Sequence, residues 1–183
     1  MAEENNPEKA ATDQASEQTA DQTPKGVQFA LQRVYLKDMS FESPMGMMVL
    51  QKQWQPKIEQ DLNTSVNKLN ENSYEVILKL TVNATIEGKT AFLVEIQQGG
   101  LFQITGLEGP QLAHVFNTMC AQILFPYARE AIDNVVVKGG FPALNLPPIN
   151  FDALFAQAMR EVRANAEANK AEVNNASAPA SAE

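Results

Sequence analysis

The residue types that could carry out chemistry are few, and their surroundings argue against catalysis. The 183 residues include one histidine, His114, and one cysteine, Cys120. A single histidine excludes a metal site built on a histidine pair, and a single cysteine excludes an intrachain disulfide and a cysteine-based zinc cluster. Both lie in an apolar stretch with helical spacing, where a core histidine and a buried thiol are the ordinary expectation. We therefore predict that the protein is not an enzyme and uses no cofactor and no metal.

A glycine pair, Gly99 and Gly100, interrupts an alternating apolar stretch and raises the question of a phosphate loop. A P-loop requires a lysine followed by serine or threonine after its glycines, and a dinucleotide fingerprint requires three glycines that open a helix. Here Phe102 and Ile104 resume the alternation instead. The pattern favours a strand in which the glycines permit a close backbone approach or a β-bulge.

Net charge and composition limit the partners and divide the chain. The formal charge of −8 argues against a nucleic-acid backbone or an anionic membrane as the main partner. Residues 1–26 contain no Val, Ile, Leu or Phe and cannot bury enough apolar surface to order themselves. We predict a disordered acidic leader over 1–26, a folded domain over 27–160 and a flexible, Ala-rich C-terminal tail over 161–183. We also expect a cytoplasmic protein without direct membrane insertion, because neither a signal peptide nor a run of about 18 apolar residues is present.

Hydrophobic periodicity predicts strands first and helices afterwards. Alternation with period two indicates four strands, joined as an antiparallel meander with a long loop after the first strand, over 27–42, 57–69, 74–86 and 91–104. Helical spacing follows over 109–124, Pro126 begins or kinks a second helical segment that ends at Gly139 and Gly140, and Asn150 caps a last helix. The fold class is α+β, a four-stranded antiparallel sheet with helices packed on one face.

Two groups of residues outside the core pattern suggest binding. Apolar side chains gather in two loops, where they either pack into the domain's own core or form an adaptable binding surface; they are Met45, Met47, Met48, Val49 and Trp54 in one, and Phe141, Leu144 and Leu146 in the other. Asp38 and Glu42 share one face of a strand about 13 Å apart, and Leu93 and Glu95 share a face of another. An acidic sheet face is either simply solvated or a docking site, and the residues alone leave both readings open.

Five motifs, in this order, resemble the SecB family of bacterial preprotein-export chaperones: "DMSFE", "KQWQP", "AFLVEIQQGGLF", "LFPYAREAI" and "FPALNLPPINFDALF". The resemblance spans about Val27 to Phe155. It implies an ATP-independent chaperone that holds unfolded secretory preproteins, keeps them translocation-competent and delivers them to the SecA motor. It also implies a homotetramer, a dimer of dimers. Departures from the family pattern include the long acidic leader and Met119 and Ala121, where the family usually has tyrosine and proline.

The resemblance also implies roles for individual residues. The positions implied for SecA docking are Asp38, Glu42, Leu93 and Glu95. The positions implied for a client-binding groove are Phe41, Trp54, Phe141, Leu144, Leu146, Phe151, Leu154 and Phe155. The positions implied for the oligomer interface are Val94, Ile96 and Gln98. Two alternatives remain at this stage: a specialised SecB-like chaperone of a toxin–antitoxin system, and a structural or small-molecule-binding domain with apolar loops.

Overall fold

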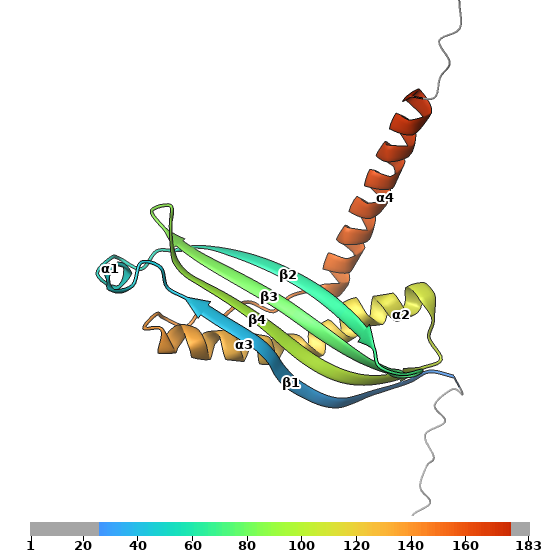
Figure 1. Cartoon of the computed structure of the whole chain (residues 1–183), viewed down its shortest axis with the longest axis horizontal. Coiled ribbons are helices and arrows are strands. Elements are labelled where there is room, and N and C mark those ends of the chain that lie inside the picture. The colour runs from blue at the N-terminus through green and yellow to red at the C-terminus, as the bar shows by residue number, and fades with distance from the viewer. Residues whose placement is uncertain (1–25, 177–183) are drawn as a thin grey trace, which may run out of the picture.

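A computed structural model describes residues 26–176 of the chain (Figure 1). Four strands form one antiparallel sheet: β1 (Gln28–Glu42), β2 (Lys57–Lys68), β3 (Ser73–Ile86) and β4 (Lys89–Thr105). This confirms the predicted four-stranded antiparallel sheet. The predicted leader lies outside the described residues except for Gly26.

The strand order is β1-β4-β3-β2, so the predicted meander is correct only for β2, β3 and β4. β1 pairs with β4 and not with β2, its neighbour in sequence. The long connection after β1 makes this possible because it can pass from one edge of the sheet to the other, and it contains the short helix α1 (Met47–Leu50). β1 and β2 are therefore the two edge strands.

The tight turns fall where the sequence places them. Glu87 and Gly88 join β3 to β4 with positive φ angles of 51° and 75°, which suits a two-residue hairpin turn. Between β2 and β3, the side-chain oxygen of Asn70 accepts hydrogen bonds from the backbone N–H groups of Asn72 (3.1 Å) and Ser73 (2.9 Å). Both predicted turns are confirmed.

The glycine pair in β4 permits close approach on both faces of the sheet. A Cβ atom on Gly99 would lie 2.5 Å from Cζ of Tyr35, and one on Gly100 would lie 2.8 Å from a methyl carbon of Leu124. Neither distance is compatible with a side chain, so the Tyr35 ring covers one glycine and Leu124 of the helical layer covers the other. In the β1–β4 pair, the register shifts lie on β1, between Leu31 and Arg33 and between Leu36 and Asp38.

One nearly continuous helical rod covers one face of the sheet. It consists of α2 (Gly109–Val115), the π-helical turn η1 (Phe116–Cys120) and α3 (Ala121–Lys138). The alternative in which Pro126 begins a second helical segment is wrong, because this proline lies inside α3 and the irregular turn comes before it, at η1. α3 ends at Lys138, and Gly140 has the positive φ of 88° that a left-handed backbone requires.

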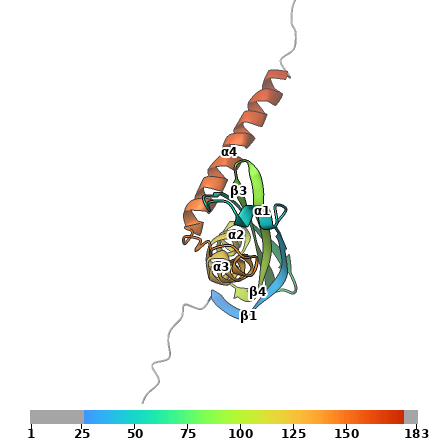
Figure 2. The same cartoon turned by 90° about the vertical axis from the view of Figure 1, so that its left-hand side faces the viewer.

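The last helix, α4 (Phe151–Ala176), begins where Asn150 accepts a hydrogen bond from Ala153 N at 3.0 Å, as the predicted cap requires. It continues to Ala176, so the structure contains no break at the predicted boundary after residue 160. Figures 1 and 2 both show α4 extending away from the sheet and from α3. In the described part of the chain, no helix is both long and apolar enough to span a membrane.

The end-on view in Figure 2 shows the α2–η1–α3 rod on one side of the sheet, and the core lies between the two. Even-numbered residues of β3 and β4 point into it and include the fully buried Leu78, Leu80 and Phe102. Odd-numbered residues of these strands point to the opposite face, which no helix of residues 26–176 covers. The clear alternation in the sequence therefore reflects a sheet with one buried and one open face.

Candidate functional site

The register of the sheet gathers the four predicted docking positions on the face without helices. Glu42 lies opposite Leu93, and Ser40 lies opposite Glu95. Asp38 lies opposite Gln97, two residues along β4 from Glu95. Directly opposed residues of antiparallel strands share a face, so two acidic residues from β1 join an acidic and an apolar residue from β4. These four residues are called the acidic face below.

The carboxylates of the acidic face differ in their surroundings. Glu95 Oε1 lies 2.9 Å from Lys79 Nζ on β3, and Thr81 Oγ1 lies 3.5 Å from Glu95 Oε2. Asp38 and Glu42 are exposed. Neither has an ion-pair partner within residues 26–176. The acidic face thus offers two free charges and one that is already paired.

A polar network that the sequence analysis missed lies beside the acidic face. Tyr35 donates a hydrogen bond to Glu75, Lys37 Nζ contacts the same carboxylate at 2.8 Å, and Asn67 Nδ2 donates to it at 2.6 Å. These bonds, with Lys37 the largest contributor, lower the pKa of Glu75 to about 2. Burial, followed by the hydrogen bond to Glu75, raises the pKa of Tyr35 to about 12. The network fixes the Tyr35 ring over Gly99.

This network joins residues from three strands, which explains why sequence patterns missed it. Glu75 lies 38 and 40 residues from its β1 partners. Glu75 of β3 lies opposite Leu101 of β4, and Leu101 lies opposite Arg33 of β1, near the bulge. Only this pairing through β4 brings Glu75 close to its β1 partners. The sequence signal that was available is Glu75 itself, an acidic residue at a central-strand position.

The three residues expected at the oligomer interface lie inside the single chain. Val94 and Ile96 are fully buried, and Gln98 is 4% exposed. Their even positions point to the helical layer, and Gln98 Nε2 donates to the backbone oxygen of Tyr35 at 2.7 Å. The expectation of direct contact between subunits is therefore wrong for these side chains, because they are already covered within one protomer.

The residues expected to line a client groove fall into two places. The first is an aromatic cluster of Phe41, Trp54, Phe92 and Phe141 beside α1. Phe92 is its centre, with ring centroids 4.9 Å from Phe141, 5.8 Å from Phe41 and 6.1 Å from Trp54. Phe92 was not among the predicted residues, although its even position in β4 identifies it as a core residue.

Two of the predicted groove residues in the extended segment after α3 belong to the core. Phe141 and Leu146 are buried, whereas Leu144 is half-buried. The extended segment that contains them is tied to α3: Asp133 Oδ1 accepts from Leu144 N at 2.9 Å, and Arg129 donates to the Leu146 backbone oxygen at 3.3 Å. The side chains of Phe141 and Leu146 therefore pack in the core and are not exposed to a client.

The second place is a groove of about 570 Å³ between β2 and the start of α4. Apolar and amide side chains dominate its lining, namely Gln60, Leu62, Asn63, Thr64, Asn117, Ile149, Phe151, Leu154, Phe155, Gln157, Ala158 and Glu161. It includes the remaining three predicted residues, of which Phe151 is buried, Phe155 half-buried and Leu154 exposed. Its floor is the inner side of β2, where the α2–η1–α3 rod leaves the edge strand partly uncovered.

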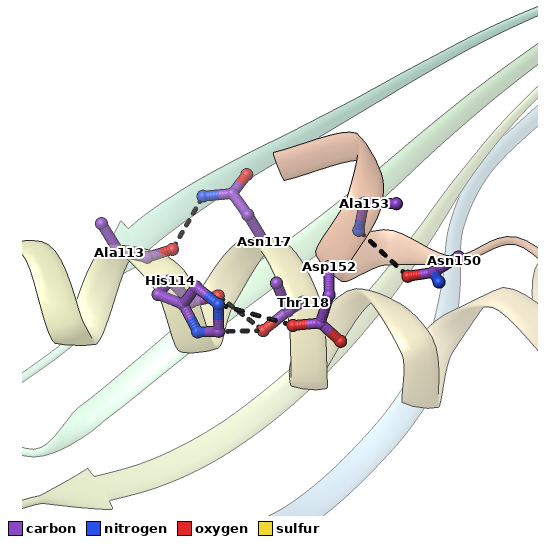
Figure 3. A network of polar contacts seen from close by, with 7 residues as sticks. All are labelled: Ala113, His114, Asn117, Thr118, Asn150, Asp152 and Ala153. Carbon is purple, nitrogen blue, oxygen red and sulfur yellow. Dashed lines mark hydrogen bonds and ion pairs between the residues drawn. The ribbon is translucent and has the colours of Figure 1, made fainter. Parts of the chain in front are cut away.

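The single histidine and the single cysteine differ in their accessibility. His114 Nε2 lies 3.4 Å from Asp152 Oδ1 in the first turn of α4, next to the Asn150 cap (Figure 3). Cys120 is fully buried, and burial raises the pKa of its thiol to about 12. A buried thiol that stays protonated is a packing residue, not a nucleophile.

Comparison with known proteins identifies the family. Residues 20–162 match the family described as "Preprotein translocase subunit SecB". A "Protein-export protein SecB" from Marinobacter nauticus is 60% identical over 133 residues, which are 73% of this chain and 81% of the relative. Its counterpart from Cellvibrio japonicus is 52% identical over 161 residues, which are 88% of this chain and 96% of the relative.

A solved structure supports the fold independently. A Mycobacterium tuberculosis SecB-like chaperone, in complex with a peptide from an antitoxin, superposes with a TM-score of 0.55 at 12% identity, covering 67% of this chain and 91% of the other. At this identity the likeness concerns the fold alone. The identities of 52–60% are to export proteins, so the toxin–antitoxin alternative is not favoured. The chain therefore belongs to the SecB family of protein-export chaperones.

Proposed function

We propose that this protein holds unfolded secretory preproteins in the cytoplasm without ATP and delivers them to the SecA motor. The observation that carries the proposal is the separation of two surfaces on opposite faces of one sheet. Leu62 of the groove lies opposite the buried Leu80 and so points to the helix side, whereas Glu95 points to the open side. A client in the groove would leave the acidic face free for the motor.

The groove and the aromatic cluster suit the client role. Their surfaces are mostly apolar, and an unfolded chain gains roughly 25 cal/mol for each Å² of apolar surface that it buries. Weak contacts spread along an extended client add up through avidity without demanding a particular sequence. The exposed Met47 and Met48 of α1 extend the aromatic cluster with flexible side chains that adapt to different clients.

The acidic face suits the motor role. Free carboxylates on Asp38 and Glu42 attract a basic surface, and Leu93 supplies an apolar contact among them. Electrostatic attraction accelerates encounter and weakens as salt rises. We therefore propose that Asp38, Glu42, Leu93 and Glu95 together bind SecA.

We propose assembly as a homotetramer, a dimer of dimers, through surfaces other than the buried β4 residues. The edge strand β1 has a free side, and its inner face leaves Leu31, Leu36 and Met39 exposed. Unpaired strand edges with apolar side chains favour association with another copy. Light scattering should give a particle of four times the 20.1 kDa chain mass; a monomer at micromolar concentration would contradict this assembly.

Refolding kinetics test the client role directly. An unfolded secretory precursor is diluted into buffer with increasing amounts of the protein, and its return to the native state is followed by fluorescence. We expect refolding to slow until about one tetramer is present for each precursor chain. Unchanged refolding at a several-fold excess of the protein would rule out the holding function.

A further inference from the structure

The start of α4 forms one wall of the groove and carries the attachment of the whole helix to the domain. Within the described residues, α4 packs mainly on η1, and its later turns extend away from the body (Figure 1). The angle at which α4 leaves the domain therefore depends on contacts in its first turns. Those contacts also set the width of the groove, because Leu154 and Phe155 of the wall lie in the same turns.

Besides the packing on η1, two side-chain contacts hold these first turns. Phe151 is buried with its ring edge-on to Phe125 of α3 at a centroid distance of 5.8 Å. His114 of α2 makes the other contact, in which its Nε2 lies 3.4 Å from Asp152 Oδ1 and its ring is edge-on to Phe155 at 5.2 Å and 88°. Asp152 and Phe155 are three residues apart and share one side of the helix, so one imidazole touches both.

The surroundings of His114 leave Asp152 as its charged partner. From η1, the hydroxyl of Thr118 donates to the His114 backbone oxygen at 2.8 Å and lies 3.4 Å from Nδ1 (Figure 3). From α4, the Asp152 carboxylate and the uncharged Phe155 ring face the imidazole. The nearby groove lining from β2 is uncharged, and the one acidic residue in that lining, Glu161, lies farther along α4.

We propose that His114 is a positioning residue for the groove, which holds Phe155 and the start of α4 in place and holds them more firmly when its imidazole is protonated. The inference rests on the proposed client-binding function of the groove. Histidine changes charge between pH 5 and 8, and the protonated ring attracts the Asp152 carboxylate. When the start of α4 is already held in place, client binding does not have to order it, and less conformational entropy is lost. Binding should therefore be tighter when the His114 imidazole is protonated.

Because both partners are substantially exposed, at 50% and 68%, the effect should be modest. Exposed ion pairs change equilibria by about two- to five-fold. The chain offers a clean background for detecting a change of this size, since His114 is its only histidine.

The test measures binding of an end-blocked, fluorescently labelled peptide of Leu, Phe, Ser and Gly between pH 5.5 and pH 8 by anisotropy. The peptide has no ionisable side chain, so the pH dependence belongs to the protein. We expect the unaltered protein to bind it about two- to five-fold more tightly at pH 5.5 than at pH 8. His114→Phe keeps an aromatic ring against Phe155, and Asp152→Asn keeps the shape of the carboxylate; both should bind equally at the two pH values.

Glu161→Gln provides the matched control, because it removes a negative charge from the same groove without touching His114. This control should keep the pH dependence of the unaltered protein. Conservation of the pH dependence in Asp152→Asn, or its loss in Glu161→Gln, would overturn the proposal. Asp152→Glu should restore most of the dependence, because a carboxylate still reaches the imidazole.

Hydrogen exchange separates this inference from the proposed client function. At pH 6 the backbone amides of residues 154–156, in the first turns of α4, should exchange faster in Asp152→Asn than in the unaltered protein, and by a larger factor than at pH 8. This readout requires no client. If the peptide failed to bind any variant while exchange differed as expected, the client role of the groove would fail and the positioning role would stand; equal exchange at pH 6 would refute the positioning role.

Discussion

Lys79 on β3 lies 2.9 Å from Glu95 on β4, so one carboxylate of the acidic face already has a cation beside it within the same chain. A basic partner that binds Glu95 must therefore compete with Lys79. Lys79→Gln should strengthen SecA binding by about two- to five-fold, the usual range for releasing an exposed ion pair. Isothermal calorimetry at low salt measures the change. Lys37→Gln is the control, because it removes the same charge from the same face but frees Glu75 instead; equal strengthening in both would attribute the effect to net charge.

Charge reversal on the acidic face should separate the two proposed partners. Asp38→Lys with Glu95→Lys should abolish SecA binding, because like charges then face its basic surface, and should leave retardation of precursor refolding intact. Glu59→Lys reverses an exposed acidic charge on β2 of the same sheet and should affect SecA binding only weakly. Loss of both activities in the double variant would indicate misfolding and contradict the separation of the surfaces.

The Glu75 network predicts how stability depends on pH. The pKa of Glu75 is lowered from 4.5 to about 2 in the folded chain, so the unfolded chain binds its proton first as the pH falls. The stabilisation by this group is complete above pH 4.5 and is lost as the pH falls towards 2. Urea unfolding between pH 2 and pH 7 should show this loss, and Glu75→Gln should flatten it. An equally steep loss in Glu75→Gln would assign the acid sensitivity to other carboxylates.

The elements and the layers of the fold follow from the sequence because each depends on local pattern. Alternation in β3 and β4, the Asn150 cap and the Gly139–Gly140 stop need only neighbouring residues. The pairing of β1 with β4 does not, because a long loop permits either edge of the sheet. The helix also continues through Pro126, and its irregular turn, η1, lies earlier, at Phe116–Cys120.

The face of the sheet on which a candidate-site residue lies was predictable from the sequence, whereas the depth at which it is buried was not. Odd and even numbering correctly predicts that the side chains of Leu93 and Glu95 lie on one face of the sheet and those of Val94 and Ile96 on the other. The numbering does not say that α3 already covers the even side, and the subunit contact expected there came from the family resemblance alone. For Phe141 and Leu146 the extended loop gives no periodicity, so sequence could not distinguish a buried from an exposed side chain.

Gly99 should tolerate no side chain while Tyr35 stays in place. Tyr35 is held over Gly99 by its hydrogen bond to Glu75, so a Cβ at 2.5 Å from the ring would force the ring away and break that bond. Gly99→Ala should lower the free energy of unfolding by about 1–3 kcal/mol, as overpacking usually does. Combining it with Tyr35→Ala should recover part of the loss relative to the sum of the two single variants. Strict additivity in this double-mutant cycle, measured by urea unfolding, would show that the two positions do not interact.

The exposed methionines of α1 should contribute to client binding without contributing to stability. Met47 and Met48 are 72% and 66% exposed, while their neighbour Val49 is buried and fixes α1 to the core beside the aromatic cluster. Full burial of a methionine side chain contributes about 1.5–3 kcal/mol, so partial burial by a client should be worth at least a few-fold in affinity for each residue. Met47→Ser with Met48→Ser should weaken client binding by about tenfold or more, measured as the concentration that halves precursor refolding, with an unchanged midpoint of thermal unfolding. Val162→Ser removes a similarly exposed apolar side chain from α4, outside the groove lining, and should leave client binding unchanged. An equal effect of Val162→Ser would mean that general surface hydrophobicity, rather than α1, attracts the client.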